Sequence, residues 1–378
     1  MNCNKKINIV VIASSLSVFS FLFSILVSFK YVNYPLDYKL LALALMSWVV
    51  LVAFEAKYIN YYTIIIISFL LVTSETVAMT PVDANKFYVE AFQGGYYSSG
   101  YLSTLVVTGE IFSWFSKLIE TSAPEALVIV NYLIHCFCVA LLVRANHKYK
   151  VNQVFVFAIF LSPLILHHLP FLLKDFFSVF FVVLSYFFHC TWCERGKKIW
   201  LFFAVFSVVF SMLFRVYAPF YLLMFFVVNN DYKRFHWPTI FVIILSMVIF
   251  FGKEMIYYFV YAFFAFYAVP NFLDINNFLS MPFITTEAIL IFMLQVFFLV
   301  FALCNRKYED INRYLKLIAL IVAVYAFTSV FRVTYSSSYV PTGNIYLADN
   351  FFRKKIPILY VLWLFLSTIS PYNKMRFK

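Results

Sequence analysis

The sequence predicts an all-α integral membrane protein, a single polytopic bundle of about twelve helices that covers residues 1–378. Two observations predict this class. The chain is 64% hydrophobic and only 12% charged, whereas soluble domains are roughly half apolar and a quarter charged. Apolar runs also recur from Ile7 to Ser370, and no polar segment between them is long enough to form a separate soluble domain.

The spans follow from the lengths of the apolar runs. A helix needs about 20 residues to cross the hydrocarbon core, and shorter helices can cross when they are packed inside a bundle. No small-residue cleavage site closes the first run, so residues 7–29 are predicted to be a retained helix rather than a signal peptide. The predicted spans are 7–29, 38–54, 58–74, 125–143, 151–168, 176–192, 199–214, 217–228, 239–252, 287–304, 315–331 and 356–371. Two further stretches, 101–119 and 255–269, are each either a span or a helix that lies at the membrane interface.

The basic residues orient this bundle. Clusters such as ERGKK (194–198) and NRKYED (305–310) fall between consecutive spans, and Lys and Arg are enriched in cytoplasmic loops. The basic residues fall mostly in cytoplasmic loops when both termini are cytoplasmic and the stretches 101–119 and 255–269 stay outside. The predicted external loops are then 75–124, 253–286 and 332–355. The net charge of +12 is therefore mainly an orientation signal, and it requires no nucleic-acid partner.

The cysteine and histidine residues predict neither a disulfide nor a metal site. All six cysteines fall in spans or near their cytoplasmic ends, where no structural disulfide is expected. The HCTWC segment at 189–193 lacks the second ligand pair of a metal site. His167 and His168 are adjacent, so on a helix they do not face one site. We therefore expect no metal and no cofactor.

Isolated charges collect on the predicted outer side. Long loops in a compact bundle are uncommon unless they are functional, and external cations oppose the positive-inside bias. Cations from several helices can together bind a doubly charged phosphate group, with Arg supplying bidentate hydrogen bonds. The alternative is that each side chain reaches the headgroups and anchors a helix end. The candidate cations are Lys174, Arg215, Arg332, Arg353, Lys354 and Lys355.

Two carboxylates on the same side are candidates for a general base that activates a sugar hydroxyl. Asp83 is preferred because it starts a loop directly after a span, where it is both held in place and solvated. Asp175 is the second candidate, because the neighbouring Lys174 favours an ion-pairing role for it. Lys174 and Asp175 can also simply neutralise each other.

Three stretches resemble polytopic enzymes of bacterial surface-polysaccharide assembly. PVDANKFYVEAF (81–92) is similar to the first external loop of GT-C glycosyltransferases, where an acidic residue at a helix end serves catalysis. SPLILHHLPFLLKDFF (162–177), followed by FRVYAPFYLL (214–223), resembles a P…KD…R-P/Y pattern of such proteins. NIYLADNFFRKKIPIL (344–359) looks like their late N…R-x-R-x-P element. The nearest families are the Wzy-type O-antigen or capsule repeat-unit polymerases and related GT-C-like membrane glycosyltransferases.

This resemblance implies a GT-C-like bundle in the bacterial inner membrane with its active face toward the periplasm. The implied reaction is polymerisation of undecaprenyl-pyrophosphate-linked oligosaccharide repeat units during O-antigen and lipopolysaccharide biosynthesis. The candidate carboxylates would supply the base, and the six cations would bind the pyrophosphate and stabilise its departure. Whether a chain-length regulator is a further partner stays open.

Three alternatives to the polymerase are retained. One is a GT-C-type glycosyltransferase that uses a polyprenyl-phosphate sugar donor, and another is an acetyl- or phospho-group transferase acting on the same glycan. The third is a flippase or transporter for the lipid-linked oligosaccharide. A flippase is expected to place charges in mid-span along a translocation path, and the predicted span centres are nearly free of charge.

Overall fold

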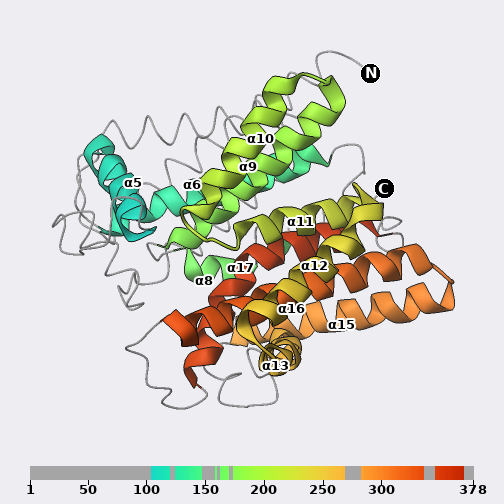
Figure 1. The fold of residues 1–378 in the computed structure, drawn as a ribbon. Helices are drawn as coiled ribbons and strands as arrows, with labels where there is room; N and C mark the ends of the chain where they lie inside the picture. Colours follow the sequence, from blue (N-terminus) through green and yellow to red (C-terminus); the bar gives the residue numbers. More distant parts are fainter. Residues whose placement is uncertain are drawn as a thin grey trace. The chain divides into compact units, whose positions relative to one another are not determined.

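The computed structural model describes residues 104–119, 124–146, 158–159, 162–169, 173–268, 282–335 and 345–369. Over these residues the regular secondary structure is helical, with no strand (Figure 1), which confirms the all-α class. The predicted spans 7–29, 38–54 and 58–74 and the candidate base Asp83 lie outside the described residues.

The described helices follow the predicted spans closely from residue 124 onward. The span predicted at 151–168 is the exception, because most of it lies outside the described residues. In chain order the helices are α5 (Thr104–Ile119), α6 (Pro124–Ala145), α8 (Pro163–His168), α9 (Lys174–Arg195), α10 (Lys198–Met212), α11 (Ala218–Asn229), α12 (Lys233–Phe251), α13 (Met255–Ala268), α15 (Pro282–Cys304), α16 (Tyr308–Tyr335) and α17 (Ile345–Thr368).

Four segments of the described helices are long and apolar enough to cross a membrane. They are Lys174–Arg195, Lys233–Phe251, Ile284–Cys304 and Tyr308–Thr328. Large apolar side chains cover the outward faces of these helices, as on α12, where Phe241 is 65% and Phe250 is 82% exposed. Water would make such faces costly, and lipid makes them favourable. The protein is therefore a membrane protein, and the total of about twelve spans stays a prediction.

The external segments are more helical than the predicted loops. α16 continues to Tyr335 and α17 begins at Ile345, so Arg332 and residues 353–355 lie in helices rather than in a loop. α5 and α13 match the stretches 101–119 and 255–269, which were predicted to be helices. The loop assignment is wrong at Arg332 and at residues 353–355 because hydropathy marks only the apolar part of a helix. Backbone hydrogen bonds continue the helix into polar residues until a capping or breaking residue ends it.

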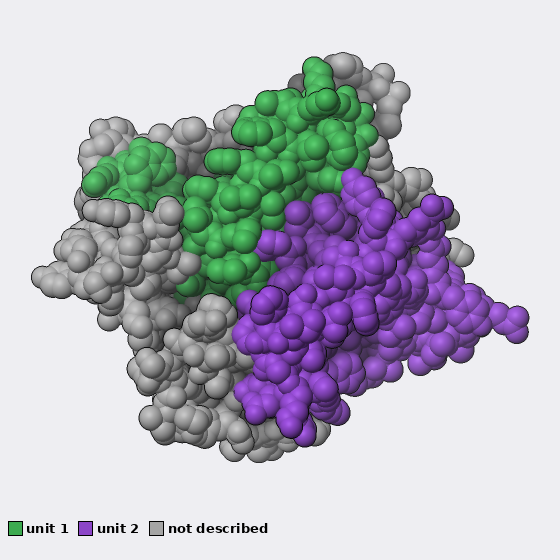
Figure 2. Space-filling view, in the orientation of Figure 1, with its two compact units in different colours: residues 1–149, 156–218 green, residues 150–155, 219–378 purple. Residues whose placement is uncertain are grey.

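The chain forms two compact units, which Figure 2 draws in different colours. Unit 1 comprises residues 1–149 and 156–218, and unit 2 comprises residues 150–155 and 219–378. That the two units belong to one polytopic domain stays a prediction.

Unit 1 is organised around a hairpin of α9 and α10, which lie side by side in Figure 1. α9 ends at Gly196, which adopts the left-handed conformation (φ 68°) and donates its N–H to the carbonyl of Trp192. The hydroxyl of Ser185 donates to the carbonyl of Ala204 across the hairpin at 2.7 Å. Because the connection is short, the start of α9 and the end of α10 lie at the same end of the hairpin.

Unit 2 is built around α16, against which α12, α13, α15 and α17 pack. Figure 1 shows α13 nearly end-on while α15 runs across the view, so these two helices run in different directions. One face of α13 buries Ala262 and Phe266, and the other exposes Tyr257 and Phe264. The stretch predicted at 255–269 is thus an apolar helix with one buried face and one exposed aromatic face, and its placement at the membrane interface stays a prediction.

Candidate functional site

The start of α9 carries a buried ion pair in unit 1. Leu173 precedes the helix with extended backbone, Lys174 opens it, and Asp175 lies in its first turn, where the helix dipole favours a negative charge. Oδ1 of Asp175 accepts hydrogen bonds from Nε of Arg215 at 2.9 Å and from Nη2 at 2.5 Å. The side chain of Asp175 is 3% exposed and that of Arg215 is 18% exposed.

This ion pair favours one of the two roles predicted for Asp175, which were general base and ion-pairing partner. Asp175 takes an ion-pairing role, and its partner Arg215 comes from the turn after α10, 40 residues further along the chain. A carboxylate oxygen that accepts two guanidinium hydrogen bonds is a poor acceptor for a substrate proton. The geometry therefore favours Asp175 as the residue that positions Arg215, whose guanidinium also lies 5.8 Å from the centre of the Tyr217 ring.

A second group of charges is buried in unit 2, at the middle of α17. Lys354 and Lys355 are only 9% and 8% exposed, and Glu287 on α15 is 6% exposed. The ammonium of Lys355 lies 5.7 Å from the centre of the Phe266 ring on α13, within range of a cation–π contact. Three helices therefore contribute to the surroundings of Lys355.

Two opposing effects act on the pKa of Lys355. This residue lies one position before the predicted span 356–371. Burial lowers its pKa to about 7, because the charged ammonium loses its hydration, and the carboxylate of Glu287 opposes that shift. Lys355 therefore titrates near neutral pH, so small changes in its surroundings decide whether it is charged.

The local sequence of α17 places these lysines at a helix irregularity. Pro357 lies inside the helix and has no N–H, so it cannot donate the helical hydrogen bond to the carbonyl of Arg353. The polar residues 353–355 precede this point, and the buried apolar residues from Ile358 to Leu366 follow it. The proline therefore lies between the charged residues 353–355 and the apolar residues 358–366 of the same helix.

The structure brings the predicted cations together only in part. Lys174, Asp175 and Arg215 lie at one end of the α9–α10 hairpin in unit 1. Lys354 and Lys355 are adjacent at the middle of α17 in unit 2, and Arg332 and Arg353 lie on α16 and α17 of the same unit. Convergence of all these residues on one substrate stays a hypothesis.

Sequence reasoning missed Glu287. It stands in the segment ITTEAIL at the edge of the predicted span 287–304, where a single charge was taken as a helix end. A positional signal was present in the sequence: Glu287 and Lys355 both stand at the outer ends of predicted spans, 287–304 and 356–371. Depth alone does not show which helices are neighbours, and the structure supplies that information.

Among the described residues, no group of three His, Cys, Asp or Glu side chains is arranged to hold a metal ion. In the HCTWC segment, Sγ of Cys193 lies 3.7 Å from Nε2 of His189, one helical turn away. This is a contact between two neighbouring side chains on α9.

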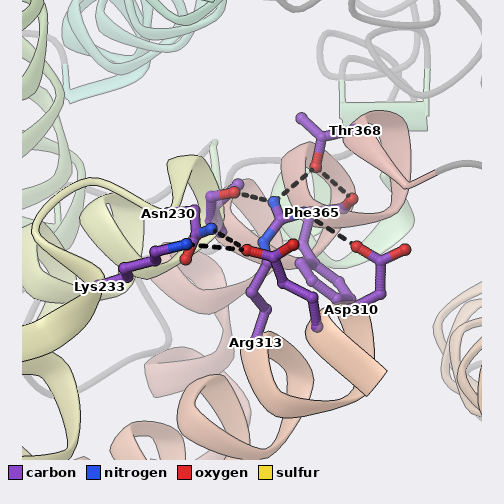
Figure 3. A network of polar contacts seen from close by, with 8 residues as sticks. Asn230, Lys233, Asp310, Arg313, Phe365 and Thr368 are labelled. Atoms are coloured by element: carbon purple, nitrogen blue, oxygen red, sulfur yellow. Dashed lines mark hydrogen bonds and ion pairs between the residues drawn. The ribbon is translucent and has the colours of Figure 1, made fainter. Parts of the chain in front are cut away.

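A polar network joins four helix ends at the opposite end of unit 2 (Figure 3). Glu309 at the start of α16 accepts a hydrogen bond from Nδ2 of Asn230 at 2.8 Å and lies 3.6 Å from Nζ of Lys233. Arg313 pairs with Asp310 at 3.2 Å. The guanidinium of Arg313 also donates to the carbonyl of Val228 and to the hydroxyl of Thr368, and it faces the Phe365 ring.

This network agrees with the orientation inferred from charge. Its residues come from the end of α11, the starts of α12 and α16, and the end of α17, and each of these positions was predicted to face the cytoplasm. In the same region, burial raises the pKa of Asp231, and a hydrogen bond from Asn229 opposes that shift. Residues predicted on one side of the membrane therefore meet at one end of unit 2.

The sidedness can be tested with reporter fusions. An alkaline phosphatase domain fused after Lys253, in the turn before α13, is expected to be active because that turn is predicted to face the periplasm. The same domain fused after Lys307, in the turn before α16, is expected to be inactive, and a fluorescent protein at this position is expected to fluoresce. The opposite pattern would invert the topology, and equal activity at both positions would place the two turns on one side.

Comparison of the chain with protein-family models, with curated protein sequences and with solved structures finds no significant match.

Proposed function

We propose that the protein is a glycosyltransferase of the bacterial inner membrane that polymerises undecaprenyl-pyrophosphate-linked oligosaccharide repeat units on the periplasmic face. The observation that carries the proposal is the burial of the adjacent residues Lys354 and Lys355 in the middle of α17. Burying a cation costs several kcal/mol unless an anion compensates for it. Together with Arg332 and Arg353, these lysines make four basic residues on α16 and α17, and a described carboxylate that acts on Lys355 is that of Glu287.

A lipid-linked diphosphate fits this surplus of positive charge. Its phosphate oxygens carry more than one negative charge, and its polyprenyl chain lies in the bilayer beside the bundle. Arg332 lies near the end of α16 and Arg353 directly precedes Lys354 in α17, and we assign both to the same anion. Cations in a site of low dielectric stabilise the charge that develops on a departing pyrophosphate.

The reaction assigned to this site is a transfer of the growing chain. A hydroxyl of one lipid-linked repeat unit attacks the anomeric carbon of the growing chain, forming a new glycosidic C–O bond. The bond from that carbon to the pyrophosphate oxygen breaks, and undecaprenyl pyrophosphate leaves with the electron pair. A carboxylate takes the hydroxyl proton, and the sequence candidate for this role is Asp83. Asp175 is assigned to positioning because it binds Arg215.

The site chemistry is shared with one alternative. A GT-C-type transferase with a polyprenyl-phosphate sugar donor would need the same cations, and it differs in adding one sugar instead of a repeat unit. A flippase is less well supported, since the predicted span centres are nearly free of charge.

The test is deletion of the gene in its own bacterium, followed by electrophoresis of the lipopolysaccharide or capsule. We expect the polymer ladder to be lost and a band with a single repeat unit to remain, because units are still made and exported but not joined. Loss of every repeat unit would assign the protein to an earlier step, such as sugar transfer or flipping. An unchanged ladder would overturn the proposal.

A further inference from the structure

Two side chains near the end of α9 form a thiol–imidazole pair that the proposed reaction does not use. Sγ of Cys193 lies 3.7 Å from Nε2 of His189, within the range of a hydrogen bond to sulfur. The two residues are one helical turn apart, so they occupy the same face of the helix. An imidazole in contact with a cysteine activates it as a nucleophile by accepting the thiol proton.

The fold holds the imidazole in place and leaves the thiol accessible. His189 is only 6% exposed, and its ring packs against the Trp192 ring with 5.8 Å between centroids. Cys193 is exposed. A base within hydrogen-bond reach of an accessible nucleophile is the geometry that proton transfer requires. The pair therefore combines a fixed base with a sulfur that small reagents can reach.

The surroundings of Cys193 favour the thiolate, which is the form of cysteine that reacts. The next five residues are ERGKK (194–198), and all of them are exposed. Charged side chains at a helix end lie at the water boundary of a membrane, so the adjoining thiol lies there as well. Three of these five residues are basic and one is acidic, so the turn adds net positive charge beside the sulfur.

We propose that Cys193 and His189 form a reactive thiol site that small hydroperoxides oxidise, separately from the glycan chemistry. Nε2 of His189 accepts the thiol proton, and the thiolate sulfur attacks one oxygen of the peroxide. An S–O bond forms, the O–O bond breaks, and the departing hydroxide takes the proton from the imidazolium and leaves as water. Sulfur is thereby oxidised to a sulfenic acid while hydrogen peroxide is reduced. A sulfenic acid is reversible, because thiols convert it back through a disulfide.

A second cysteine provides a matched control within the same chain. Cys193 and Cys304 are the exposed cysteines among the described residues. Cys304 also lies at a helix end, that of α15, and the basic residues Arg306 and Lys307 follow it. The residue one turn before it is Val300, which cannot accept a proton. The two thiols therefore share exposure and nearby positive charge, and they differ in the histidine.

The experiment treats the purified full-length protein in lipid nanodiscs with hydrogen peroxide in the presence of dimedone, which traps sulfenic acids. Mass spectrometry of the peptides then gives the rate of labelling at each cysteine. A positioned base typically accelerates a reaction by about 10²–10⁴-fold in enzymes, and we expect Cys193 to be labelled at least about tenfold faster than Cys304. Equal rates, or a faster rate at Cys304, would overturn the site.

Two substitutions test the base itself. His189→Leu is expected to lower the labelling rate of Cys193 to that of Cys304, and an unchanged rate in the folded variant would overturn the role of His189. Val300→His places an imidazole one turn before Cys304 and is expected to raise the rate there by about tenfold. Val300 is 54% exposed, so this variant leaves the core intact and decides the question if His189→Leu does not fold. An unchanged rate at Cys304 would then overturn the proposal.

Discussion

Replacement of Arg215 by alanine is expected to destabilise the protein by about 3–5 kcal/mol, because it leaves the Asp175 carboxylate buried without its guanidinium partner. The carboxylate is 3% exposed, so it cannot regain hydration without local unfolding of the start of α9. Thermal unfolding of the purified protein in detergent measures the loss. Arg215→Lys is expected to retain part of the stability, since an ammonium supplies charge but not the two hydrogen bonds from Nε and Nη2.

Substitution of Asp175, the other partner of the ion pair, tests whether the loss of stability comes from an unpaired buried charge. Asp175→Asn is expected to cost less than Arg215→Ala, because the remaining guanidinium is 18% exposed and keeps some contact with its surroundings. The double variant Asp175→Asn with Arg215→Met is expected to be more stable than Arg215→Ala alone, because no buried charge remains. If Arg215→Ala unfolded at the same temperature as the unaltered protein, the ion pair would not stabilise this hairpin.

The hairpin shows what hydropathy and turn chemistry can predict. Two apolar runs of about the same length flank ERGKK, and its glycine permits the left-handed conformation that ends α9. An antiparallel pair with Lys174 and Arg215 at one end follows from that pattern. The hydrogen bonds from Arg215 to Asp175 do not follow, because they depend on the rotation of each helix about its axis, which an apolar run does not record.

The charged residues of unit 2 show where prediction failed and why. Residues 353–355 were placed in a loop since their polarity ended the apolar run, but α17 begins eight residues earlier at Ile345. Glu287 was not considered, because the sequence does not show that α15 and α17 bring it close to Lys355. By contrast, the cytoplasmic positions inferred from basic clusters do meet in the network around Arg313. Charge patterns therefore grouped residues that meet at one end of unit 2, and the side of the membrane that this end faces stays a prediction.

Lys355→Met is expected to abolish the polymer ladder while the protein stays folded, which is the largest effect on activity that the structure predicts. Methionine has a similar length and no charge, so it removes the cation from the anion site and also relieves the cost of burying an ammonium. Loss of one group that stabilises a developing negative charge typically slows a reaction by about 10²–10³-fold. The variant is expressed in the deletion strain, and the lipopolysaccharide is separated by electrophoresis.

The control is Lys253→Met, which removes an exposed lysine in the turn between α12 and α13, outside the anion site. This variant is expected to restore the full ladder, because that lysine only reaches the headgroup region. Lys355→Met should unfold at a temperature equal to or above that of the unaltered protein, which distinguishes loss of chemistry from loss of fold. A complete ladder from Lys355→Met at normal expression would remove Lys355 from the site, since an uncharged side chain cannot replace an ammonium in holding a leaving pyrophosphate.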